Sequence, residues 1–176
     1  DDSFIYDIKL FDNGKYGCFV SDDENSFALL DENFECIAIS DEKWPNYCFP
    51  FTITVQNNVL VYEKNEDIGY TVYELSGENA ELIGTYNIAI DEIFEVFDGY
   101  EEYSFLYSNS EGLFGYDISN EKTDMITDAN GRIVNAEKKT DDRLCVTYSV
   151  ESSDANKVLI NCNGSESISE IEYDKN

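Results

Sequence analysis

Histidine is absent from this chain of 176 residues, and its absence excludes several kinds of catalytic site. Ser–His–Asp and Cys–His arrangements need an imidazole as general base, so neither can exist here. His-ligated zinc and two-histidine iron sites are excluded for the same reason. Five cysteines are present, but no two form a CxxC pair, so a zinc knuckle or thioredoxin-type site has no support. The sequence therefore favours a protein that is not an enzyme and has no cofactor or metal.

Basic residues are scarce: 11 Lys and Arg stand against 38 Asp and Glu, for a net charge of −27. Affinity for nucleic-acid phosphates comes from clustered Lys and Arg, so DNA and RNA are excluded as partners. Anionic membrane surfaces are excluded on the same ground. Basic proteins, Ca²⁺ or a surface that normally binds DNA remain as partners. The alternative interpretation is that the acids keep an aromatic-rich domain soluble.

Long apolar runs are also missing, and none approaches the roughly 20 residues of a membrane-spanning helix. The first ten residues lack the basic flank and apolar stretch of a signal peptide, and the chain does not begin with its one methionine, Met125. An odd number of cysteines leaves at least one free thiol, and a disulfide between Cys145 and Cys162 across a hairpin stays open.

A short pattern recurs along the chain at an interval of about 43 residues. It is clearest in "IGYTVYELS" (68–76) and "EGLFGYDIS" (111–119), which share Gly69 with Gly112 and Tyr73 with Tyr116. "SFALLDEN" (26–33) and "KVLINCNG" (157–164) occupy the same place in more divergent copies. Tyrosines that recur with the pattern favour a structural role over a binding surface.

Each copy lies among further runs rich in β-branched and aromatic residues, which predict short strands joined by polar turns. In "FTITV" (51–55), apolar Phe51, Ile53 and Val55 alternate with threonines, the period of a half-buried strand. Each unit reads as four antiparallel strands, which must stack because one such sheet cannot bury its own faces. We predict a single all-β domain over residues 1–176, with four repeats at about 1–43, 44–87, 88–131 and 132–176.

The segment "GLFGYDIS" (112–119) resembles the blade signature of β-propeller repeats common in bacterial envelope and secreted proteins. The resemblance is strongest over residues 57–127 and names no specific family. It implies a β-propeller-like fold, binding at the ends of the central axis, and a secreted or cell-surface location, with the cytoplasm left open. A fragment of a larger propeller is one alternative. "DNGKYGCFV" (12–20) is also similar to WG-type repeats, which would give another all-β repeat or sandwich.

The stretch "WPNYCFPF" (44–51) holds the chain's one tryptophan and both prolines. It connects the first repeat to the second, and connections between blades lie on the faces where propellers bind partners. Trp44, Tyr47 and Phe49 are therefore the predicted ligand-binding residues, whose rings would stack on a sugar or receive a partner's side chain. The alternative is that Trp44 and Phe49 fill the gap between the blades.

These observations lead to a binding or interaction module that presents an acidic surface to a protein, in particular a basic one, or to a surface glycan. Two other functions stay open. A glycan-active enzyme would use two carboxylates about 5–9 Å apart, and an acidic inhibitor would imitate nucleic acid with ordered carboxylates. The oligomeric state is not indicated.

Overall fold

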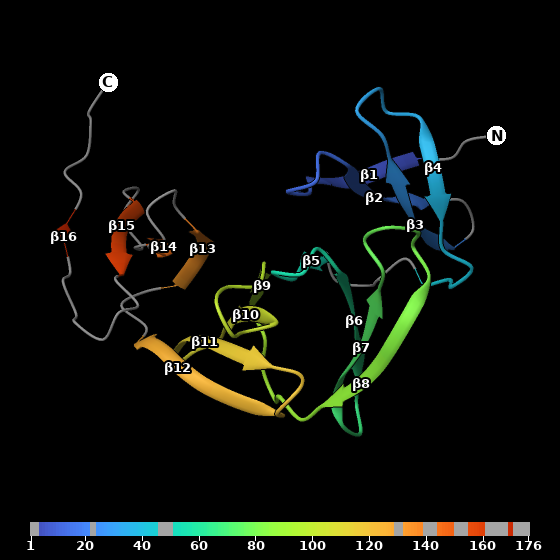
Figure 1. The fold of residues 1–176 in the computed structure, drawn as a ribbon. Helices are drawn as coiled ribbons and strands as arrows, with labels where there is room; N and C mark the ends of the chain where they lie inside the picture. The colour runs from blue at the N-terminus through green and yellow to red at the C-terminus, as the bar shows by residue number, and fades with distance from the viewer. Residues whose placement is uncertain are drawn as a thin grey trace. The chain divides into compact units, whose positions relative to one another are not determined.

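The computed structural model consists of four antiparallel sheets, each of four strands, that follow one another along the chain (Figure 1). It describes residues 4–21, 24–45, 51–128, 132–138, 144–149, 155–160 and 169–170. Within each sheet every strand pairs with the next one in sequence, so each sheet is a simple meander. Within the described residues there is no helix, and hence none that could cross a membrane.

The strands of the first two sheets are short and lie close to the predicted runs. The first sheet contains β1 (Phe4–Leu10), β2 (Tyr16–Ser21), β3 (Asn25–Leu30) and β4 (Cys36–Ile39). The second contains β5 (Thr52–Ile53), β6 (Val59–Asn65), β7 (Gly69–Leu75) and β8 (Leu82–Ile88).

The other two sheets repeat the same order. The third contains β9 (Glu95–Phe97), β10 (Phe105–Ser108), β11 (Gly112–Asp117) and β12 (Lys122–Asp128). The fourth contains β13 (Arg132–Lys138), β14 (Leu144–Ser149), β15 (Ala155–Ile160) and β16 (Ser169–Glu170).

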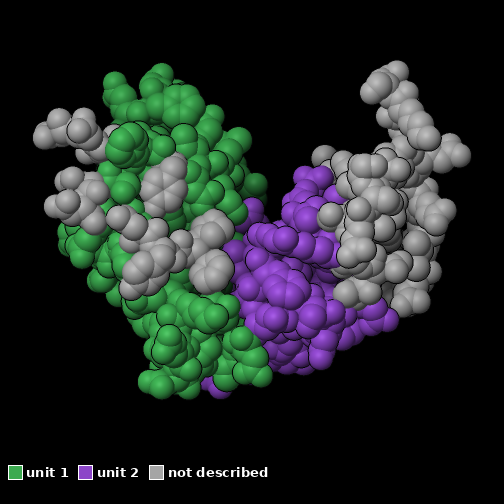
Figure 2. Space-filling view, turned by 180° about the vertical axis from the view of Figure 1, so that it is seen from behind, with its two compact units in different colours: residues 1–91 green, residues 92–176 purple. Residues whose placement is uncertain are grey.

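The chain divides into two compact units, residues 1–91 and 92–176 (Figure 2). In the first unit the first and second sheets share a core of mostly aromatic and branched aliphatic side chains. Its buried members are Phe11, Phe19, Phe27, Leu29, Trp44, Phe51, Ile53, Val59, Val61, Leu75 and Ala80. Burial of this apolar area is the main force that holds the two sheets together.

The second unit has a smaller described core. It is built from Phe97, Tyr100, Leu106, Leu113, Ile133, Ala136, Leu144 and Val146, which come from the third and fourth sheets. Each unit therefore buries apolar faces that a single sheet would expose, as the repeat pattern predicts.

The all-β prediction of four-stranded, propeller-like antiparallel repeats is confirmed. The repeated tyrosines are structural, as predicted: Tyr62, Tyr107 and Tyr116 are buried, and Tyr73 packs against the first core. The single domain, the closure of a ring and the exact repeat boundaries stay predictions.

One local prediction is wrong. The stretch 51–55 does not alternate, because Thr52 and Thr54 are buried together with Phe51 and Ile53. The Thr52 hydroxyl lies 2.6 Å from the Tyr62 hydroxyl, while Thr54 Oγ1 accepts hydrogen bonds from the N–H groups of residues 56 and 58. Buried polar groups need such partners, so these threonines satisfy their hydroxyls inside the sheet instead of in solvent.

The possible disulfide between Cys145 and Cys162 stays a prediction. Cys145 lies opposite Leu159 in the register of β14 and β15, while Cys162 lies outside the described residues.

Candidate functional site

The hairpin between β6 and β7 forms one wall of the candidate site. Asn65 and Gly69 are its last paired residues, and a three-residue turn joins them. The Asn65 side-chain oxygen accepts a hydrogen bond of 3.0 Å from the Asp67 N–H, which fixes the turn locally. Gly69 has a φ of 103°, a conformation that side chains of L residues disfavour. A glycine at the end of a three-residue hairpin turn is typical of this geometry.

Gly69 also allows the segment after β8, which forms the second wall of the site, to approach the hairpin. A Cβ atom at this position would lie 2.7 Å from the Ile88 carbonyl oxygen and 2.8 Å from that of Ile90. The chain that leaves β8 thus passes directly against the start of β7, where any side chain would collide with backbone. The recurring glycine is therefore required by backbone packing at the end of the sheet.

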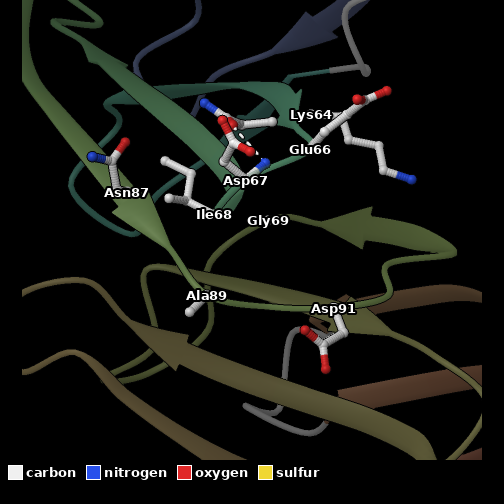
Figure 3. A pocket seen from close by; sticks show the side chains of 9 residues that line it. Lys64, Glu66, Asp67, Ile68, Gly69, Asn87, Ala89 and Asp91 are labelled. Atoms are coloured by element: carbon white, nitrogen blue, oxygen red, sulfur yellow. Dashed lines mark hydrogen bonds between the residues drawn. The ribbon is translucent and has the colours of Figure 1, made fainter.

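A hollow of about 540 Å³ lies between these two segments. Figure 3 shows the side chains of Lys64, Glu66 and Asp67 on the hairpin, and those of Ala89 and Asp91 on the segment after β8. Its full lining is Lys64, Asn65, Glu66, Asp67, Ile68, Gly69, Asn87, Ala89 and Asp91.

The hollow is acidic and exposed. Three of its residues carry carboxylates and one carries an ammonium group, on a chain with a net charge of −27. Among the described residues, no group of three or more His, Cys, Asp or Glu stands close enough to hold a metal ion, so the carboxylates are spread around the rim. Spread carboxylates with nearby amides suit an organic cation, and Ile68 and Ala89 offer apolar contact to its stem.

Trp44 is the predicted site residue that the structure describes, and it lies in the core of the first unit. Its side chain is 2% exposed, and its ring meets those of Phe19 and Tyr73 edge-on, at 6.1 and 5.9 Å between centroids. Its backbone N–H and carbonyl both pair with Asn25. This position agrees with the alternative interpretation, in which Trp44 fills the gap between the first two repeats.

Tyr47 and Phe49 lie outside the described residues. Ligand binding by this aromatic stretch stays a prediction, with the qualification that the Trp44 ring itself is covered by protein.

Sequence reasoning missed the hollow. It used Gly69 only as a landmark of the repeat and gave no role to the acids around it. The available signal was the turn "NEDIG" (65–69), in which an amide residue, two acids and a glycine follow a strand. Nothing in the sequence indicates that residues 87–91 return to this turn, since that contact depends on the path of β8.

Comparisons with known proteins support the architecture. No model of a known protein family matches the sequence, and no curated protein matches it. Among solved structures, a protein of unknown function from Bacteroides caccae is similar, with a TM-score of 0.57 and 12% identity. TolB from Acinetobacter baumannii, a β-propeller protein, is similar with a TM-score of 0.65 and 13% identity.

These alignments cover nearly all of this chain but only part of the other two. They include 96% of this chain and 60% of the Bacteroides caccae protein, and 94% of this chain and 43% of TolB. At such identities the likeness concerns the fold alone, which is propeller-like.

Proposed function

We propose that this chain is a non-enzymatic binding module whose acidic surface receives a cationic segment of a partner protein. The hollow beside the β6–β7 hairpin takes a lysine or arginine side chain of that segment. The observation that carries the proposal is the lining of the hollow, which has three carboxylates, those of Glu66, Asp67 and Asp91, and one ammonium group, that of Lys64.

A guanidinium or ammonium group suits this lining for two reasons. Carboxylates bind such groups through charge-assisted hydrogen bonds, which are about twice as strong as neutral ones. The aliphatic stem of the same side chain can rest against Ile68 and Ala89. The surrounding negative field would raise the rate of association with a basic partner and make binding sensitive to salt.

A protein partner is favoured over a glycan by the position of Trp44, the predicted sugar-binding residue that the structure describes. Sugar rings stack on exposed aromatic faces, but Trp44 is 2% exposed. The proposal includes no catalytic step, and the chain lacks histidine, the most frequent general base. The repeated sheets would act as a rigid scaffold for the loops that bind.

The test uses a fluorescein-labelled peptide in which arginine and serine alternate, and fluorescence anisotropy as the measurement. We expect the double variant Asp67→Asn/Asp91→Asn to bind this peptide about tenfold more weakly than the parent chain. The matched control is Asp12→Asn/Asp41→Asn, which removes two exposed carboxylates from the first sheet and its connections.

The control separates a site from a general field. If both double variants lose affinity equally, the overall charge explains binding and the hollow is not the site. If the parent chain fails to bind the peptide at low salt, or binds a matched glutamate–serine peptide equally well, the proposed function is wrong.

A further inference from the structure

The outer strand of the second sheet, β8 (Leu82–Ile88), is a free edge that carries no charge. Among the described residues it pairs only with β7, so its other side presents unpaired backbone groups. All seven residues, "LIGTYNI", are uncharged, in a chain where 28% of residues are charged. Leu82, Ile83, Thr85 and Asn87 are exposed, and Ile83 is 53% exposed.

Such an edge is unusual, because natural sheets protect long edges against unwanted pairing. They use lysine, proline, bulges or a covering segment. β8 has neither lysine nor proline, and its one bulge lies near its start, at Ile83, between the Leu75–Leu82 and Glu74–Gly84 pairs. The corresponding edge strand of the third sheet, β12, is also seven residues long but carries Lys122, Asp124 and Asp128.

The β8 edge runs directly to the acidic hollow. Asn87, near the end of the strand, and Ala89, just beyond it, line that hollow together with Asp91. A chain that followed β8 to its end would thus leave the uncharged edge beside Asn87, which lines the hollow together with Ala89 and Asp91. The uncharged edge of β8 is followed by an acidic hollow. Together they indicate one extended ligand, with an uncharged part along the edge and a basic part in the hollow.

We propose that β8 receives an extended segment of the partner protein as a fifth strand of the second sheet. The segment has aliphatic or β-branched residues along β8 and one or two lysine or arginine residues in the hollow. This inference rests on the proposed function and names the form of the partner. Main-chain hydrogen bonds would supply affinity, and the hollow would supply specificity for the basic end.

A second copy of this chain is the competing occupant of the edge, and charge argues against it. Each copy carries a net charge of −27, so pairing two edges brings like charges together. A basic segment reduces the same repulsion. The described acids therefore favour a partner with the opposite charge.

The experiment compares two labelled peptides with the parent chain. One has alternating threonine and valine followed by two arginines. The other has proline in place of each valine, so it lacks every second N–H group and cannot form a regular ladder. We expect the valine peptide to bind about tenfold more tightly. Its binding should protect amides of β8 from hydrogen exchange, while amides of β12 exchange as before.

A pair of variants tests the edge itself. Ile83→Lys places a lysine on β8, and Met125→Lys places one on β12, where Met125 is 49% exposed. We expect Ile83→Lys to remove the advantage of the valine peptide over the proline peptide, and Met125→Lys to preserve it. The arginine–serine peptide should bind both variants alike, because it needs only the hollow.

The outcomes separate this inference from the proposed function. If the arginine–serine peptide binds but valine and proline peptides bind equally, the fifth strand is wrong and the hollow stands. If the arginine–serine peptide also fails, the proposed function is wrong. If sedimentation shows a dimer that Ile83→Lys disperses, a second copy occupies the edge and the proposed partner is wrong.

Discussion

The second and third sheets place corresponding residues in similar backbone positions but use different side chains to hold them. Both third strands, β7 and β11, begin with a glycine, Gly69 or Gly112. In each sheet a Cβ at that glycine would collide with the backbone at the end of the fourth strand, at Ile88 or at Thr127. The comparison teaches that the repeat preserves a close backbone approach, and that the glycine recurs for that reason.

The acids of the repeated motif, in contrast, do different things. Asp117 accepts hydrogen bonds from the N–H groups of Ser119 and Asn120 and so holds the turn after β11. Glu74, at the same place in the pattern, instead accepts hydrogen bonds from the Asn58 amide and the Tyr86 hydroxyl, each at 2.8 Å. A shared acid in the sequence thus has a turn-forming role in one sheet and a cross-strand role in the other.

The largest effect is expected from substitutions that disturb the close backbone approach shared by the two sheets. Gly69→Ala and Gly112→Ala should each lower the free energy of unfolding by about 3 kcal/mol, because backbone atoms cannot move aside for the new methyl group. Gly14→Ala is the control: its φ is 81° but no atom lies within 4 Å of the new Cβ. That change should cost about 1 kcal/mol. Urea unfolding measures all three, and a neutral Gly112→Ala would remove the common explanation.

The architecture could be predicted because local pattern and global fold agree. Strands β6, β7, β10 and β11 have β-branched and aromatic residues between turn residues, and each meets its neighbour in sequence. The interval between Gly69 and Gly112 revealed the repeat without any knowledge of contacts. Short first strands were harder. β5 is only two residues long, its Thr52 pairs with Tyr62 on β6, and Thr54, just beyond the strand, accepts a hydrogen bond in the adjoining turn.

A smaller effect should sharpen the comparison at the second strands. On the second strand of the second sheet, the Tyr62 hydroxyl lies 2.6 Å from the buried Thr52 hydroxyl. Tyr62→Phe would leave the buried Thr52 hydroxyl without this partner and lower the free energy of unfolding by about 1–3 kcal/mol.

The third sheet supplies the matched change. Among the described residues, the buried Ser108 hydroxyl has no hydrogen-bond partner. Ser108→Ala should therefore leave thermal stability unchanged or raise it. A Tyr62→Phe variant as stable as the parent in thermal unfolding would show that the hydroxyl pair is dispensable.

The smallest effect concerns pH and should appear in the third sheet but not in the second. Hydrogen bonds from the Asn120 side chain and then from the Ser119 and Asn120 amides lower the pKa of Asp117 below its usual 3.8. The stability that Asp117 contributes is therefore complete above the unfolded value and is lost as pH falls through the folded pKa. The corresponding turn in the second sheet uses the Ser76 hydroxyl, which does not titrate in this range.

Hydrogen exchange near the two turns checks this difference. As pH falls below 4, the amides of Ser119 and Asn120 should lose protection, after correction for intrinsic rates, while that of Glu78 should not. The variant Asp117→Asn should remove the pH dependence. Equal loss of protection at both turns would indicate general acid unfolding instead.

The candidate site could not be predicted, for a physical reason. Its walls come from residues 64–69 and 87–91, which meet only because the chain after β8 crosses Gly69. The prediction that Trp44 binds a ligand depends on its rarity and on its place between repeats. Rare aromatic residues in such connections suit a buried plug as well as a binding surface, and composition cannot separate the two.

The position of Trp44 gives the molecule a built-in optical probe. The chain has one tryptophan, and its ring is enclosed by aromatic residues of the first unit. Its fluorescence should therefore follow the unfolding of residues 1–91, whereas circular dichroism follows strands throughout the chain. Agreement or divergence of the two signals would reveal whether the two units melt together or one at a time.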